Sequence, residues 1–246
     1  MIMFKEIDEK KVLLDAKRPL STNSIGNLKK YFDIDLTYNS NAIEGNTLTI
    51  TETKVILEEG LTIGRGKSLR EHLEVINHKE AIDYIEDIVS KNINISERVI
   101  RDLHYIILKS IDNKNAGEYR KTNVLISGSE HRPVEHFLVH ERMEELINWY
   151  NENKNKLHKI HLAAEFHFRY VYIHPFIDGN GRTARLLMNL ILMSNGYPIT
   201  VIKTEDRDIY MKALEKASTQ NDISEFVNIV SEAVDRSLDT YLYIVS

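Results

Sequence analysis

The stretch of sequence that decides both the fold and the chemistry of this chain is His174-Pro175-Phe176-Ile177-Asp178-Gly179-Asn180-Gly181-Arg182-Thr183-Ala184-Arg185. It contains a possible base, a carboxylate, an amide between two glycines, and two arginines. Packing requirements alone do not select that combination. Pro175 prevents the preceding helix from continuing, and the next helix is expected to begin near Arg182. The pattern predicts a helix-loop-helix corner with polar chemistry in its loop.

The second half of this loop has the features of an anion site. Gly179 and Gly181 allow successive backbone N–H groups to point into one concavity. The helix that follows adds the positive end of its dipole. Arg182 and Arg185 are three residues apart and share one helix face, and guanidinium groups suit phosphate oxygens. These positions predict binding of a phosphate-bearing ligand, against the alternative of an ordinary glycine turn.

Two side chains in the first half of the loop could act on such a ligand. His174 belongs to the residue type whose ordinary pKa lies near neutrality, so it could accept a proton from an attacking hydroxyl. Asp178 could hold Mg²⁺, which favours one or two carboxylates together with substrate oxygens. Phe176 is expected to point into the core and anchor the loop.

The composition is that of a globular protein without cysteine chemistry. The chain has 246 residues, of which 42% are hydrophobic and 28% charged, and it has no cysteine. This suits a reducing, cytoplasmic location. The N-terminus is too charged for a signal peptide, and the longest apolar stretch, near Leu186–Met193, is too short to span a membrane. The net charge of -5 argues against nucleic acid, whose binding domains usually carry a basic excess. We therefore expect neither membrane nor nucleic acid as a partner.

The spacing of apolar residues predicts a mainly helical protein. Helices are expected over 68–89, 96–107, 143–150, 158–172, 182–194 and 223–244. One segment differs, because Thr122–Ile126 has strand composition and Glu130–Val134 leads back from a Ser-Gly-Ser turn. Pro133 in the returning arm suits an exposed edge. The sequence thus predicts an all-α fold with one short β-hairpin at about 122–134.

The loop has the form HxFx(D/E)GNGRxxR, and it resembles the active-site loop of Fic-domain proteins. The run 161–173 resembles the helix that precedes this loop in the family, and Leu186-Leu187 and 196–198 fit the helix that follows it. Gly117–Arg120 resembles the entry to the family's target-binding flap. The similarity covers roughly the whole chain. It implies a Fic fold, with an N-terminal helical region at 1–90 and a catalytic core at 91–246 packed as one compact unit.

Most proteins of that family transfer AMP from ATP to protein hydroxyls, so the resemblance implies a protein adenylyltransferase. A Tyr, Thr or Ser hydroxyl would attack the α-phosphorus of ATP with release of pyrophosphate. Carried over by position, the general base is His174, the Mg²⁺ ligand is Asp178, the α- and β-phosphates are held by Gly179, Asn180 and Gly181, and the outer phosphates are held by Arg182 and Arg185.

A second motif lies near the N-terminus, where Ser40-Asn41-Ala42-Ile43-Glu44-Gly45-Asn46 matches (S/T)xxxE(G/N). The residues predict a helix over Asp33–Glu44, with Gly45 as the residue after its cap. A carboxylate at that helix end faces the negative pole of the dipole and would be better placed beside a cation. The motif resembles the inhibitory motif of the Fic family, and this resemblance names Arg185 as the partner of Glu44. It implies inhibition within one chain, against the alternative of a common surface glutamate.

The expected hairpin could present backbone groups to an extended segment of a protein target. The resemblance assigns this role to the flap residues Val124, Leu125 and Ile126, with a separate protein or the chain itself as target. The alternative is an ordinary surface hairpin. His131-Arg132-Pro133 also departs from the more apolar flap exit of the family. The helix at 223–244 could form a homo-oligomer surface, although burial in the core explains its apolar face equally.

Several rival interpretations remain open from the sequence. Gly60–Ser68 imitates a P-loop, but its first glycine is one residue too far from Gly66-Lys67-Ser68. A zinc hydrolase would need a ligand set that His158, His161 and His167 do not form by spacing. The site could remove AMP from proteins, use another nucleotide, or bind nucleotide without catalysis. Tyr210 could lie in an adenine pocket or in the core.

Overall fold

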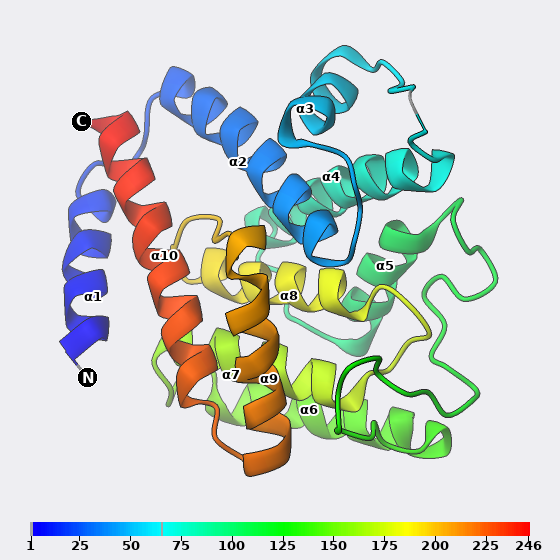
Figure 1. Cartoon of the computed structure of the whole chain (residues 1–246). Helices are drawn as coiled ribbons and strands as arrows, with labels where there is room; N and C mark the ends of the chain where they lie inside the picture. The colour runs from blue at the N-terminus through cyan, green and yellow to red at the C-terminus, as the bar shows by residue number, and fades with distance from the viewer. Residues whose placement is uncertain (1, 65) are drawn as a thin grey trace.

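The computed structural model describes residues 2–64 and 66–246, and the regular structure within them is helical (Figure 1). Within these residues, ten α-helices and two short 3-10 helices follow one another. They are α1 (Ile2–Asp15), α2 (Thr22–Ile43), α3 (Ile50–Glu59), α4 (Leu69–Ser90), α5 (Glu97–Leu108), η1 (His136–Leu138), α6 (Val139–Asn153), α7 (Lys159–Ile173), α8 (Asn180–Ser194), η2 (Thr204–Asp206), α9 (Arg207–Gln220) and α10 (Ser224–Val245). The all-α fold predicted from apolar spacing is therefore confirmed.

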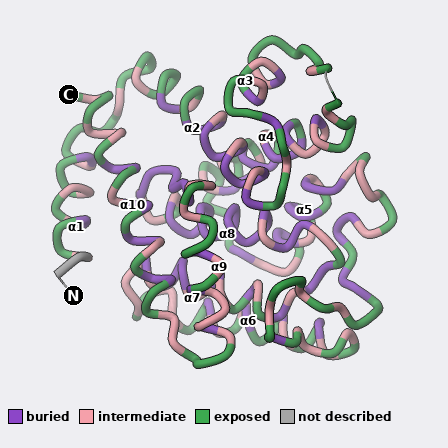
Figure 2. The backbone as a smooth tube through the Cα atoms, viewed as in Figure 1, coloured by how far each residue is buried: buried purple, intermediate pink, exposed green. Residues whose placement is uncertain are grey.

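Helix α8 lies at the centre of the molecule. It packs against α7 on one side and against α4, α5 and α2 on others, and its backbone is buried along nearly its whole length (Figure 2). A helix that is apolar on most sides requires neighbours around it. The residues from Ala184 to Leu192 are all buried, so the surrounding helices cover this part of α8. Because α8 begins at the loop 174–185, the central helix of the core also positions the candidate site.

The helix ends follow capping chemistry that can be read from the sequence. Ser68 caps α4 in a capping box with Glu71, which confirms the interpretation of 60–68 as a connection rather than a P-loop. Ser96 caps α5 through the N–H of Val99. Asn195 follows α8 as predicted, and Gly196 has a φ of +79°. Helix α8 begins at Asn180, two residues earlier than the predicted Arg182.

Four helical segments lie outside the predicted ranges: α1, the first half of α2, α3 and α9. Helix α1 packs along α10, so that the first and the last helix of the chain lie side by side (Figure 1). Among the residues of α1 whose burial is described, Phe4 to Asp15, the fully buried apolar side chains are Ile7 and Leu14, which leaves a weak periodic signal. Helix α3 joins a small separate cluster of apolar residues formed by Leu48, Ile56 and Val75.

The predicted β-hairpin is wrong as secondary structure, because residues 121–135 contain no strand. The side chain of Arg120 enters between the two arms, and its guanidinium donates to the carbonyls of Thr122 and Val134. Glu130 N–H donates to the Glu215 carboxylate at 2.8 Å, and Pro133 has no N–H to donate. Side chains thus replace the ladder hydrogen bonds that a hairpin would need.

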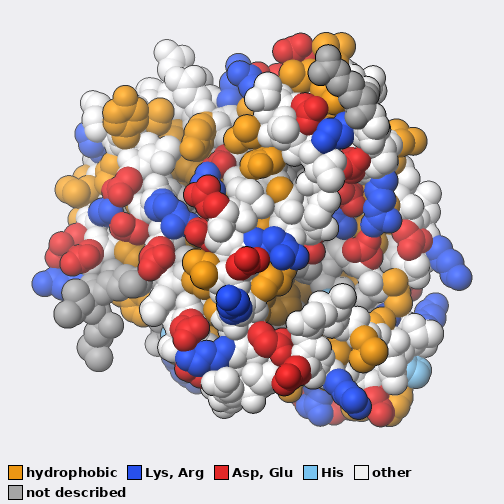
Figure 3. Space-filling view, viewed as in Figure 1, with side chains coloured by type: hydrophobic (Ala, Val, Ile, Leu, Met, Phe, Trp, Pro, Cys, Tyr) orange, Lys and Arg blue, Asp and Glu red, His pale blue; other side chains and the backbone are white. Residues whose placement is uncertain are grey.

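The face of the molecule seen in Figure 3 carries charges of both signs, interspersed with apolar side chains. Across residues 2–64 and 66–246, we find no helix that combines the length and the apolar character needed to cross a bilayer.

Candidate active site

The turn that precedes α8 is built by two side chains. Phe176 is fully buried and stacks on His104 of α5, with ring centroids 3.5 Å apart, which confirms that it anchors the loop. Asn180 is also buried, and its side-chain amide accepts from Phe176 N–H at 3.1 Å and donates to Phe176 O at 2.9 Å. The side chain of Asn180 therefore shapes the loop, and its backbone N–H remains for a ligand.

The start of α8 has backbone N–H groups that no N-cap side chain bonds. Its N-cap residue is Gly179, which has a φ of +75° and no side chain to bond the first N–H groups of the helix. These groups carry the positive end of the helix dipole. A Cβ at Gly179 would lie 3.3 Å from His104 Nε2. A glycine is thus needed here both for the backbone conformation and for the close approach of α5.

His174 occupies a backbone conformation that non-glycine residues rarely adopt. It is the C-cap of α7, with φ 52° and ψ 62°, and its carbonyl accepts from Arg120 Nε at 2.8 Å. Such conformations cost free energy, need support from their surroundings, and concentrate at functional sites. Burial lowers the pKa of His174 to about 4, and the Arg120 guanidinium acts in the same direction. The imidazole is therefore neutral near pH 7 and able to accept a proton.

Arg185 is fully buried and contacts the end of α2. Its Nη2 lies 2.7 Å from Glu44 Oε1 and donates to the carbonyl of Ser40 at 2.8 Å. Its Nε donates to Ser40 Oγ at 3.0 Å. The structure thus brings the two sequence motifs together at the pair expected from the family resemblance. Ser40 contributes two contacts to the same guanidinium and fixes its orientation.

The Glu44 carboxylate also lies directly against the start of α8. A Cβ placed on Gly181 would be 2.1 Å from Glu44 Oε1. The carboxylate therefore occupies the space beside the glycine backbone into which a phosphate group would fit. Glu44 caps the end of α2, and its N–H bonds to Asn41 O at 3.0 Å. The same helix end thus places a negative group both on Arg185 and over Gly181.

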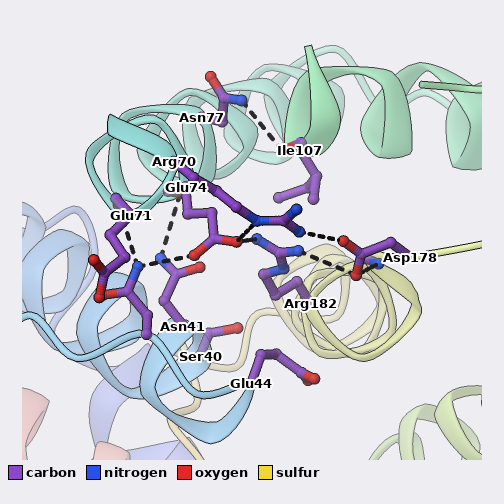
Figure 4. A network of polar contacts seen from close by, with 12 residues as sticks. Ser40, Asn41, Glu44, Arg70, Glu71, Glu74, Asn77, Ile107, Asp178 and Arg182 are labelled. Carbon is purple, nitrogen blue, oxygen red and sulfur yellow. Dashed lines mark hydrogen bonds and ion pairs between the residues drawn. The ribbon is translucent and has the colours of Figure 1, made fainter. Parts of the chain in front are cut away.

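Asp178 and Arg182 belong to a four-residue network with Arg70 and Glu74 of α4 (Figure 4). Arg70 Nη2 lies 2.5 Å from Asp178 Oδ2, and Arg70 Nε lies 3.2 Å from Glu74 Oε1. Arg182 is buried and pairs with Glu74 at 3.2 Å and with Asp178 at 3.6 Å. Burial alone would raise the pKa of Asp178. Arg182, the Gly179 N–H and Arg70 outweigh this effect and together hold the pKa below its ordinary value.

Nothing in the sequence indicated that Arg70 and Glu74 lie at the site. They lie four residues apart at the start of α4, a spacing that is common on solvated helix faces. Their proximity to Asp178 arises only because α4 packs against α8. In the present arrangement, Arg70 holds the Asp178 carboxylate, and Glu74 holds Arg182.

Replacing Arg70 with glutamine is expected to lower the Mg²⁺ concentration needed for ATP binding several-fold. If Asp178 holds Mg²⁺, as the family resemblance implies, the guanidinium and the metal ion would compete for the same carboxylate oxygen. The side chains of Arg70 and Asp178 are 55% and 44% exposed, and ion pairs with such exposure contribute about 0.2–1 kcal/mol. Calorimetric titration of ATP at increasing Mg²⁺ would measure this. Arg98→Gln, at an exposed arginine on α5, provides a matched control. An unchanged or higher Mg²⁺ requirement in Arg70→Gln would show that Arg70 does not compete with the metal.

The flap residues lie at the surface, with Leu125 82% exposed and Val124 and Ile126 half-buried. The tip of the segment is fastened to α9 by contacts of Ser129 and Glu130 with Glu215. His131 Nε2 lies 2.8 Å from the carbonyl of Tyr172 near the end of α7. The segment is therefore tied to the helix that ends at His174, and the apolar side chain of Leu125 remains exposed.

Other candidate residues lie in the core. Tyr210 is buried, with its hydroxyl 3.3 Å from Arg185 Nη1 and 3.0 Å from His167 Nε2, as the core interpretation predicted. Among the residues described, no group of three or more His, Asp or Glu side chains is arranged to hold a metal ion. His158 instead contacts Asp8 of α1 at 3.1 Å.

The free energy of unfolding is expected to fall as pH is lowered from about 6.5 to about 4. Burial lowers the pKa of His104 to about 4, whereas an unfolded histidine titrates near 6.5. In this pH window the unfolded state thus binds a proton that the folded state does not bind. This difference lowers the free energy of unfolding by about 3 kcal/mol between the two ends of the window. Urea unfolding between about pH 7 and pH 4.5 measures the slope. His104→Gln should reduce that slope by about one proton, and an unchanged slope would contradict the assignment.

Comparisons with known proteins identify relatives of this chain. The model of the Fic/DOC family matches residues 94–192. The chain is 36% identical over 241 residues to a protein adenylyltransferase Fic of Drosophila grimshawi, covering 98% of this chain and 49% of that protein. It thus spans about half the length of the curated relatives it matches.

Two solved structures are similar over almost all of this chain. A Fic-domain-containing signaling protein from Bacteroides thetaiotaomicron has a TM-score of 0.88 and 33% identity, covering 99% of this chain and 97% of that one. Fic-1 from C. elegans has a TM-score of 0.88 and 33% identity, covering 98% of this chain and 72% of that one. With identity and coverage of this extent in both sequence and structure, the chain belongs to the Fic/DOC family.

Proposed function

We propose that this chain is a protein adenylyltransferase that transfers AMP from ATP to a Tyr, Thr or Ser hydroxyl of a protein. The observation that carries the proposal is the convergence of a neutral histidine, a helix start without a side-chain cap and two buried arginines on one loop. His174 would accept the proton of the attacking hydroxyl. The new bond forms between that oxygen and the α-phosphorus, and the bond to the leaving pyrophosphate breaks.

The residues around the loop fit a nucleotide triphosphate. The N–H groups of Asn180 and Gly181 at the start of α8 would face the α- and β-phosphates. The N–H of Gly179, which donates to Asp178 Oδ1 at 2.6 Å in this structure, would join them once that bond opens. Arg182 and Arg185 would hold the outer phosphates once they are released from Glu74 and Glu44. Positioning and charge stabilisation of this kind supply most of the catalysis in phosphate-transfer sites.

The carboxylate of Asp178 suits Mg²⁺, because it lies 44% exposed at the edge of this anion site. One carboxylate combined with phosphate oxygens and water is a usual arrangement for this ion. When bound, Mg²⁺ would neutralise the phosphate charge. Asp178 would hold it after Arg70 moves away.

The contact of Glu44 with Arg185 supports inhibition within the chain. While Glu44 holds Arg185 and fills the space over Gly181, the outer phosphates of ATP cannot take the position that aligns the α-phosphorus with an attacking hydroxyl. ATP would then bind unproductively. Ser40 supports this state by its two contacts with Arg185.

The protein target would dock on the segment 122–134 through Val124, Leu125 and Ile126. The support for this is the exposed apolar side chain of Leu125 and the attachment of the segment to the end of α7. The target class is a protein that offers an extended stretch with a hydroxyl side chain, and a second copy of this chain meets that description.

Intact-mass measurement of the wild type and Glu44→Gly, after incubation with Mg²⁺ and each nucleoside triphosphate, tests the proposal. We expect a covalent AMP adduct on Glu44→Gly with ATP, and less or none on the wild type. An adduct with another nucleotide would change the nucleotide assignment. Absence of any adduct on the chain or on proteins of a cell extract would overturn the transferase assignment.

Removal of AMP from proteins is a second candidate, because the half-exposed Glu44 carboxylate lies beside the site and could position a water molecule. The Glu44→Gly chain that carries a covalent AMP adduct serves as the AMP-modified protein substrate. If wild type removes the AMP faster than Glu44→Gly does, Glu44 supports the reverse reaction. If wild type leaves the adduct intact, Glu44 acts only as an inhibitor.

A further inference from the structure

His104 of α5 contacts two segments that the proposed function uses for different purposes. Its Nδ1 lies 2.9 Å from Gly117 N, at the entry to the segment 122–134. Its Nε2 lies 2.9 Å from the carbonyl of Asp178, in the turn before α8. The ring is fully buried. One side chain thus joins the target-docking segment to the phosphate-binding turn.

The partners of the ring determine its tautomer. A backbone N–H can only donate, so Nδ1 accepts from Gly117. A carbonyl can only accept, so Nε2 carries the proton and donates to Asp178 O. Neither the other tautomer nor the doubly protonated ring can make both bonds. His78 and His167 are equally buried, but each has one ring nitrogen without a hydrogen-bond partner among the residues described.

Packing around His104 leaves both segments little freedom. The ring stacks on Phe176 with an interplanar angle of 6° and lies against Gly179. On the other side, Gly117 has a φ of +71°, and a Cβ there would be 3.1 Å from Arg101 O of α5. Each segment therefore meets α5 at a glycine that permits close backbone approach.

We propose that His104 is a positioning residue that holds the phosphate-binding turn and the entry to the target-docking segment in one fixed relation. A displacement of either segment breaks a buried hydrogen bond at the shared ring. Nucleotide binding at the start of α8 and target docking on 122–134 thereby depend on a common support. The functional consequence rests on the proposed function, whereas the support itself is testable without activity.

Asparagine and glutamine separate the two contacts of the ring. Asparagine places an amide atom near the position of Nδ1 and is too short to reach Asp178. Glutamine reaches the position of Nε2 and leaves that of Nδ1 empty. His104→Asn should therefore preserve the bond from Gly117, and His104→Gln should preserve the bond to Asp178.

Amide hydrogen exchange reports each support directly. His104→Asn is expected to speed exchange about tenfold over 177–181 and to leave 117–118 unchanged, and His104→Gln should give the reverse pattern. His72 is a matched control, because this buried histidine of α4 bonds Ile63 N at 2.8 Å and Ser68 O at 2.8 Å. His72→Gln should leave both segments unchanged. Identical patterns in the two His104 variants would overturn the proposal.

ATP binding with Mg²⁺, measured by calorimetry in a background of Glu44→Gly and His174→Ala, adds the functional readout without turnover. His104→Asn should weaken ATP binding about tenfold, and His104→Gln should weaken it by less than about twofold. Equal weakening of ATP binding by the two His104 variants would show that His104 contributes only packing. If this background binds no ATP, the proposed function fails, and the exchange pattern still decides the role of His104.

The wild-type chain allows the same test if the variants do not fold. NMR of the protein labelled with ¹⁵N-histidine identifies which ring nitrogen is protonated. We expect His104 to carry its proton on Nε2 and to retain it there on addition of ATP. A proton on Nδ1 would exclude the bond from Gly117 and overturn the proposal.

Discussion

Glu44→Gly is expected to increase AMP transfer between about tenfold and a hundredfold over the wild type. The substitution removes a charge-assisted hydrogen bond to the buried Arg185, which is worth about 1.5–3 kcal/mol, and each 1.4 kcal/mol corresponds to about a tenfold change. It also clears the space beside Gly181, where the Glu44 carboxylate lies within 2.1 Å of a Cβ position. Transfer of labelled AMP at saturating target measures the effect.

Glu59→Gly is the matched control for this variant. Glu59 ends α3 and precedes Gly60, whose φ is +65°, so the control repeats a glutamate-to-glycine change at an exposed helix end away from the loop. It should leave AMP transfer at the wild-type level. Equal activities of Glu44→Gly and wild type would show that the contact with Arg185 does not restrain the reaction.

His174→Ala in the Glu44→Gly background is expected to lower AMP transfer by about a hundredfold to ten-thousandfold, the usual contribution of general-base catalysis. Burial and Arg120 keep the pKa of the His174 ring at about 4, so the wild-type imidazole is neutral and available near pH 7. The turnover number should fall while ATP affinity changes little, because the ring contributes to proton transfer rather than to phosphate binding.

Two controls separate catalysis from folding at this position. Asparagine tolerates the left-handed backbone of residue 174 but cannot serve as a base, so His174→Asn should be as inactive as His174→Ala while keeping the turn. His161→Ala, at a partly exposed histidine in the first turn of the same helix, should retain activity. Substantial activity in His174→Asn would mean that another group accepts the proton.

Local sequence information was sufficient for most of the helices and for the loop itself. Ser68 and Ser96 mark helix starts by hydrogen bonds within a few residues. The capping residues, the glycines of the loop and the apolar spacing act over one or two helical turns. Such features depend on residues close together in the chain and not on distant neighbours, so they could be predicted.

The segment 121–135 shows where this local information fails. Strand propensity indicates that a segment could pair, but the hydrogen bonds of a hairpin need free carbonyls on both arms. The buried Arg120 takes the carbonyls of Thr122 and Val134. That arginine is held in turn by His174 O, which lies 54 residues away in the chain.

The sequence by itself determined which functional groups the loop carries, because the residue types at 174–185 and their spacing place a histidine, a carboxylate, two glycines and two arginines within twelve residues. With the family resemblance, it also determined that Glu44 should meet Arg185. Only the tertiary structure decided what surrounds these groups: Arg70 on Asp178, across 108 residues, and His104 beneath the turn, across 74 residues. Contacts between separate helices depend on how the core packs α4 and α5 against α8, and no local pattern in the chain specifies them.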